Sequence, residues 1–153
     1  MGCVEGRSFA GFYECKYCDG FGKIKLDDFT LAYVECALWS SNDESDETGG
    51  EPLDSNYGLD DIAPATLSMM RADCAKFQEA CGDHFISDNH KSRFDCDIDE
   101  QAGHDFWLTR NGHGAGFWDG DWVEPAASIL DKSSKTFGCF NLYVGDDGQV
   151  WGY

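Results

Sequence analysis

The chain is poor in basic residues and has no long apolar run. It carries 11 Lys and Arg against 29 Asp and Glu in 153 residues, which gives a formal net charge of −18 at pH 7. Nucleic-acid binding depends on Lys and Arg contacts to phosphates, so this deficit argues against direct binding to nucleic acid. No apolar stretch approaches the roughly 18 residues of a membrane-spanning helix, and we expect no membrane association.

The first dozen residues lack the apolar segment of a secretory signal peptide. Eight cysteines in a chain without such a signal indicate a reducing compartment, with free thiols or a metal site rather than disulfides. We therefore expect a cytoplasmic protein. A hydrophobic content of 42%, with 14% aromatic residues, is typical of a folded globular chain.

Three segments have the pattern of a helix. In residues 61–82, apolar residues recur at helical spacing and place Cys74 and Cys81 on the buried stripe. Pro64 suits the first turn of this helix, and Gly82 suits its end.

Residues 27–41 also predict a helix, with Asp28 as a plausible cap and a strand as the alternative. Residues 124–138 predict the third helix, which would begin near Pro125 and end at Gly138.

The last segment, residues 140–153, alternates around Asp-Asp-Gly and predicts a β-hairpin. We expect an α+β fold of about three helices packed on antiparallel hairpins. Residues 28–153 would form this single domain. Residues 1–27, rich in cysteine and glycine, would form a small N-terminal knuckle or extension.

The most distinctive stretch is HDFWLTRNGHGAGFWD, residues 104–119. Asn111-Gly112 is a strong signal for a two-residue hairpin turn, and it would set Trp107 opposite Gly116. The glycines would then make room for a ring instead of cradling a phosphate. The predicted core comprises Leu67, Met70, Phe77, Phe106, Leu108, Phe117, Ile129, Leu142 and Val144.

The tip of this hairpin would carry Arg110, Asn111 and His113. A guanidinium beside an imidazole could bind a phosphate or a carboxylate, and a plain solvated turn is the alternative. His104 and Asp105 would lie about 20 Å away at strand rise, too far for a catalytic pair with His113. No nucleophile has a base at a meaningful spacing, so enzymatic activity is open but not favoured.

The stretch GHDFWLTRNGHGAGFWD, together with YVECALWSS, DDIAPATL and LYVGDDG, resembles a family of small acidic proteins encoded by bacteriophages. The resemblance covers about residues 29–150. It implies a phage origin, hence the cytoplasm of a bacterial host, but no activity, because the family is largely of unassigned function. The first 27 residues and the segment DNHKSRFDCDIDE depart from the pattern.

Cys15 and Cys18 stand in a C-x-x-C-x-G-x-G sequence that resembles the zinc modules of Hsp40-type chaperones. Those modules pair two such repeats per zinc, whereas this chain has one. Cys3 would be a third ligand, and free thiols are the alternative to zinc. No candidate for the fourth ligand has a matching spacing; the candidates are Cys36, His84, His90 and Cys96.

Charge, small size and the phage resemblance together predict an interaction protein that binds a basic surface of a host protein and inhibits it. The partner would be a nucleic-acid-handling defence factor, as for anti-CRISPR or anti-restriction inhibitors, which mimic duplex DNA or plug a nucleic-acid channel. A small-molecule or nucleotide binder or enzyme using Arg110, Asn111 and His113 is the alternative. A structural accessory, whose acidity only confers solubility, is the third possibility. The oligomeric state is left open.

Overall fold

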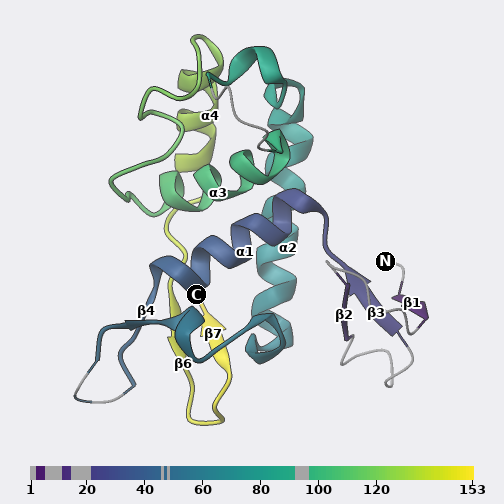
Figure 1. The fold of residues 1–153 in the computed structure, drawn as a ribbon, viewed down its shortest axis with the longest axis vertical. Coiled ribbons are helices and arrows are strands. Elements are labelled where there is room, and N and C mark those ends of the chain that lie inside the picture. The colour runs from purple at the N-terminus through teal and green to yellow at the C-terminus, as the bar shows by residue number, and fades with distance from the viewer. Residues whose placement is uncertain (1–2, 6–11, 15–21, 46, 48, 92–96) are drawn as a thin grey trace.

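The computed structural model describes residues 3–5, 12–14, 22–45, 47, 49–91 and 97–153, with side chains from residue 25 onward. These residues form an α+β fold, as predicted (Figure 1). Its helices are α1 (Asp28–Ser40), α2 (Pro64–Cys81), α3 (Ile98–Arg110) and α4 (Ala126–Lys135). None of the described helices is long and apolar enough to cross a membrane.

Short antiparallel sheets accompany the helices (Figure 1). One sheet has the order β1 (Cys3–Glu5), β3 (Gly22–Lys25), β2 (Phe12–Glu14). The others pair β4 (Asn42–Asp43) with β5 (Glu51–Pro52), and β6 (Leu142–Val144) with β7 (Val150–Gly152). The last pair confirms the predicted C-terminal hairpin. Its connection contains Gly148 at a φ of +76°, a conformation that glycine adopts without strain.

The first two helices follow the sequence pattern closely. α2 starts at Pro64 and is capped by Gly82, and both Cys74 and Cys81 are buried in it, as expected. α1 excludes the strand alternative for residues 27–41. Its N-cap is Asp27, one residue before the predicted one, and the Asp27 carboxylate accepts a hydrogen bond from the Thr30 amide at 2.7 Å.

The predicted hairpin over residues 104–119 is wrong, because α3 continues to Arg110. The Asp97 carboxylate caps this helix by accepting from the amides of Asp99 and Glu100 at 2.8 and 3.3 Å. At the other end, the Gly112 amide donates to the Thr109 carbonyl, and the next amide bonds back to the carbonyl of residue 108. Gly112 has a φ of +70°, so Asn-Gly here ends a helix in a Schellman motif.

The side chain that packs closely against Gly116 is therefore not the predicted one. A Cβ at this position would collide with the Thr109 side chain, not with Trp107. The Thr109 hydroxyl lies there to accept a hydrogen bond from the Phe117 amide at 3.0 Å. The close approach fixes the loop that follows α3 against the helix.

The core is an aromatic cluster between α1, α2 and α3. α1 and α3 meet at Gly103, where the absence of a Cβ leaves space for the Phe29 carbonyl. The rings of Phe77 and Phe106 stack with centroids 4.1 Å apart. Eight of the nine predicted core residues are buried or pack partly buried against this cluster. The exception is Ile129 on α4, which is 38% exposed because α4 packs its other face.

Candidate functional site

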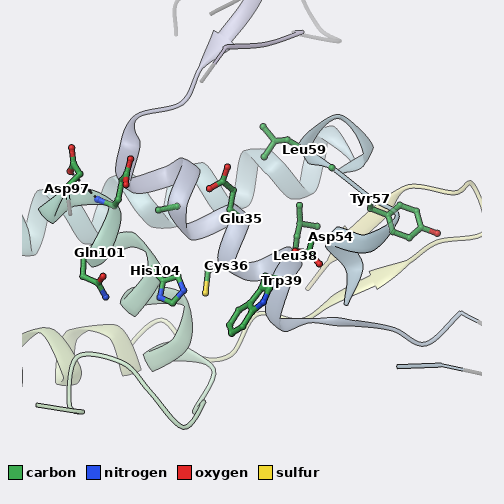
Figure 2. Close-up of a pocket in the computed structure, with 13 residues that line it drawn as sticks. Glu35, Cys36, Leu38, Trp39, Asp54, Tyr57, Leu59, Asp97, Gln101 and His104 are labelled. Carbon is green, nitrogen blue, oxygen red and sulfur yellow. Dashed lines mark hydrogen bonds between the residues drawn. The ribbon is translucent and has the colours of Figure 1, made fainter. Parts of the chain in front are cut away.

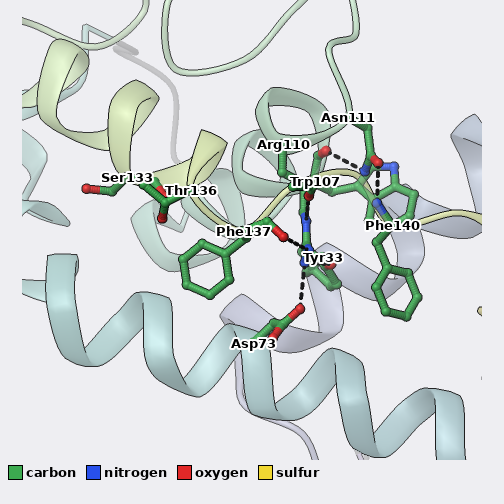
Figure 3. A network of polar contacts seen from close by, with 10 residues as sticks. Tyr33, Asp73, Trp107, Arg110, Asn111, Ser133, Thr136, Phe137 and Phe140 are labelled. Atoms are coloured by element: carbon green, nitrogen blue, oxygen red, sulfur yellow. Dashed lines mark hydrogen bonds and ion pairs between the residues drawn. The ribbon is translucent and has the colours of Figure 1, made fainter. Parts of the chain in front are cut away.

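Arg110 lies in the interior, with only 5% of the residue exposed (Figure 3). Its Nη1 donates to the Tyr33 hydroxyl at 2.8 Å and to Asp73 Oδ2 at 2.9 Å. Its Nε and Nη2 donate to the carbonyl oxygens of Gly138 and Phe137 at 2.8 and 3.1 Å. The expectation of an exposed Arg110 at a turn is wrong, and its donors are used inside the fold.

Asn111 and His113 lie nearby but do not join Arg110 at a common surface. The Asn111 amide donates to the Trp107 carbonyl at 3.0 Å, and its Oδ1 accepts from the Phe140 amide at 2.8 Å (Figure 3). Both Asn111 and the half-buried His113 line a cavity of about 540 Å³. Among its described lining residues there is no Lys or Arg, and Glu44 adds a carboxylate, so this cavity does not favour a phosphate.

A different cavity, of about 730 Å³, opens between α1 and α3 (Figure 2). Its third wall is the segment that holds the 3₁₀ turns Leu53–Ser55 and Leu59–Asp61. We call this cavity the acidic groove. The residues that characterise it are Glu35 and Trp39 of α1, Asp54 and Tyr57 of the connecting segment, and Glu100 and His104 of α3.

The described residues that line the groove give it a negative charge. Glu35, Asp54, Asp97 and Glu100 all line it and are exposed, whereas none of its described lining residues is Lys or Arg. Partial burial of the Glu35 carboxyl group, and then the carboxylate of Glu100, raise its pKa above the ordinary value. The two glutamates thus repel each other across the groove, and a cation between them would relieve the repulsion.

Carboxylates at the N-termini of α1 and α3 add to the negative charge near the groove. Burial raises the pKa of Asp99, and the carboxylates of Asp97, Asp28 and Asp27 raise it further. Asp27 and Asp97 are N-caps, so the folding of α1 and α3 accounts for part of the charge. Glu35 and Asp54, in contrast, cap neither helix.

Aromatic side chains form part of the groove wall. Trp39 is 57% exposed, and its ring centroid lies 6.3 Å from that of His104. Glu35 and Trp39 are four residues apart on α1, as are Glu100 and His104 on α3, so each helix presents one carboxylate and one ring to the groove. Carboxylates beside exposed rings are suited to binding a cation.

The cysteine among the described lining residues of the groove is not activated as a nucleophile. Cys36 lines it, but burial, and then the Asp105 carboxylate, raise the pKa of this thiol to about 12. Asp105 is itself buried, and it accepts from Trp122 Nε1 at 2.7 Å and from Gln101 Nε2 at 3.1 Å. Because Cys36 stays protonated near neutral pH, nucleophilic catalysis by this residue is not favoured.

Cys15 and Cys18 of the predicted zinc knuckle lie outside the described residues, as does Cys96, a candidate for the fourth ligand. The backbone of Cys3 lies in β1, paired with Ile24. Within the residues that are described, no group of three His, Cys, Asp or Glu side chains is placed to hold a metal. Cys36, one candidate for the fourth ligand, is buried in α1.

Sequence reasoning missed the acidic groove because it assigned strand structure to half of α3. The signal was present: Asp97, followed three residues later by Glu100, is a typical helix start. With that helix recognised, Glu100 and His104 fall on one face.

Comparison with protein-family models, with curated proteins and with solved structures finds no match for the chain.

Proposed function

We propose that the protein is a phage-encoded inhibitor that binds a basic surface of a bacterial host protein. The partner would be a nucleic-acid-handling defence factor of the kind that anti-CRISPR and anti-restriction proteins block. The protein itself would not bind nucleic acid, because its net charge is −18. It would instead occupy the site where the partner binds phosphates.

One observation carries this proposal: the acidic groove gathers four carboxylates around a cavity of about 730 Å³ with no Lys or Arg among its described lining residues. Acidity that serves only solubility would be spread over the surface, with basic residues interspersed. A concave acidic site instead focuses its field on an approaching cation and speeds association.

The test is affinity capture of host proteins by the full chain at increasing salt, compared with two variants of equal charge. The first is Glu35→Gln/Glu100→Gln in the groove. The second is Glu79→Gln/Asp83→Asn, which removes two exposed carboxylates outside it. We expect the captured protein to bind nucleic acid, to be displaced by duplex DNA, and to dissociate at high salt.

The groove variant should weaken capture about tenfold, about 1.4 kcal/mol, relative to the matched control. Equal weakening by both variants would assign the attraction to overall charge and remove the groove from the function. Capture that is unchanged from low to high salt would overturn the electrostatic mechanism itself.

The alternative, a nucleotide binder or enzyme at Arg110, Asn111 and His113, receives less support. The Arg110 guanidinium already donates to four acceptors inside the fold. Because Arg110 is buried, no described residue that lines the neighbouring cavity is a Lys or Arg that could bind a phosphate.

A further inference from the structure

Trp39 of the acidic groove has a solvent exposure that packing within the fold does not explain. More than half of it is exposed, at 57%, whereas Trp107 and Trp122 are almost fully buried and donate hydrogen bonds through their indole nitrogens. A single exposed tryptophan is ordinary on a protein surface. This one lies on the wall of a cavity, tilted by 32° against the ring of His104 (Figure 2).

The arrangement around Trp39 has two layers. Glu35 and Glu100 both line the groove, and four residues further along each helix the ring centroids of Trp39 and His104 lie 6.3 Å apart. The Nδ1 atom of His104 is buried and lies 3.8 Å from Asp105 Oδ1, so this ring contributes its face to the groove and not this nitrogen. A ligand that enters between α1 and α3 would therefore meet a carboxylate pair and, one helical turn further along the groove, a ring pair.

We infer that this part of the groove receives one arginine side chain of the partner protein, with its guanidinium stacked on Trp39 and its N–H groups donating to Glu35 and Glu100. The inference rests on the proposed function and names the group that it recognises. A guanidinium is planar, stacks on aromatic faces and presents several donors at once. An ammonium is a compact, strongly hydrated charge that would use the carboxylates but gain less from the ring.

A second copy of this chain is a poor occupant. Each copy has a formal net charge of −18, so two acidic grooves in contact would repel. A basic segment of another protein would pair with the two carboxylates and pack on the two rings.

The probes are two synthetic nonapeptides that differ only in carrying three arginines or three lysines, titrated into the full chain by calorimetry. We expect the arginine peptide to bind about tenfold more tightly than the lysine peptide. Trp39→Ala should abolish this preference while leaving binding of the lysine peptide nearly unchanged. Trp39→Phe, which keeps a ring, should retain part of the preference.

Trp118→Ala is the matched control, because Trp118 is similarly exposed, at 53%, and does not line the groove. It should keep the full preference for arginine. A preference that survives Trp39→Ala, or equal binding of the two peptides by the wild-type protein, overturns the inference.

Failure of the proposed function is measured separately. Peptides that bind equally well, but are weakened by Glu35→Gln/Glu100→Gln, leave the acidic groove as a cation site and remove only its selectivity for arginine. Peptides unaffected by that double variant exclude the groove as the cation site, and salt-independent capture of the host protein removes the inhibitor function.

Discussion

Arg110 and Asp73 form an ion pair with 2.9 Å between Nη1 and Oδ2, although 37 residues separate them in the chain. The Arg110 side chain is 2% exposed, and that of Asp73 is 26% exposed. The guanidinium also lies within 5.6 Å of the ring centroids of Phe106, Phe137 and Phe140. This pair joins the C-terminal end of α3 to the middle of α2, and the other donors of Arg110 bind the carbonyls of Phe137 and Gly138, ahead of β6.

Arg110→Ala should therefore destabilise the protein by about 2–4 kcal/mol, because it leaves a half-buried carboxylate and several acceptors without a partner. Arg110→Lys should recover only part of this loss, since an ammonium cannot reach all four acceptors. Urea unfolding at neutral pH measures both effects. Lys76→Ala, on the exposed side of α2, is the control and should change stability by no more than about 0.5 kcal/mol. A neutral Arg110→Ala would show that the network is not formed.

The crossing of α1 and α3 depends on Gly103. Any Cβ at this position would overlap the backbone carbonyl of Phe29, which cannot move without shifting α1. Gly103→Ala should lower stability by about 2–3 kcal/mol through overpacking, despite the higher helix propensity of alanine. Thermal unfolding followed by circular dichroism measures the effect.

Gly82→Ala is the matched control for this prediction. Gly82 has helical dihedral angles, and nothing lies within 4 Å of a Cβ built there. The substitution should be neutral or slightly stabilising, because it only restricts the unfolded chain. Equal effects of Gly103→Ala and Gly82→Ala would contradict the close helix contact.

Part of this fold was predictable from local patterns alone. The apolar stripe from Met70 to Cys81 and the turn at Gly148 each have one structural interpretation, and both predictions are confirmed. The dipeptide Asn111-Gly112 has two possible structural interpretations, because a residue with positive φ suits either a hairpin turn or the end of a helix. The choice depends on the cap at Asp97, fourteen residues earlier, and on packing against α1.

The candidate site was less predictable than the fold. Glu35 and Trp39 share a face of a helix that the sequence does predict, but their partners Glu100 and His104 lie about 65 residues away on a helix that it did not. No local pattern encodes which faces of two distant helices meet. Arg110 shows the converse, since a charged residue beside Asn-Gly suggests exposure, and only tertiary contacts reveal its burial.

The N-terminal cysteines give a prediction that rests on sequence alone. Purified protein should contain about one zinc per chain, and Cys15→Ser/Cys18→Ser should remove it. Elemental analysis by mass spectrometry provides the measurement. Cys139→Ser, which changes an exposed cysteine outside the motif, should leave the zinc content unchanged. Metal-free wild-type protein with an unaltered melting temperature would identify Cys15 and Cys18 as ordinary thiols.

The carboxylate of Glu35 should oppose folding at neutral pH. Its pKa in the folded protein is raised, by burial first and by Glu100 second, so the ionised form is less favourable there than in the unfolded chain. For an acid with a raised pKa, this penalty is fully present above the folded-state pKa and disappears as the pH falls below the unfolded-state value. Glu35→Gln removes the charge and should raise the melting temperature at neutral pH.

The advantage of Glu35→Gln over the wild-type protein should narrow as the pH is lowered from neutral toward the ordinary glutamate pKa of 4.5, because the wild-type carboxyl then takes up a proton. Glu79→Gln is the control: it removes an exposed carboxylate on α2 outside the groove, so any effect of net charge alone appears in both variants. A difference between Glu35→Gln and wild type that is constant over this pH range would exclude titration of Glu35 as its cause. If Glu35→Gln is more stable and also loses binding of the arginine peptide, the same carboxylate lowers the stability of the fold and binds the cation.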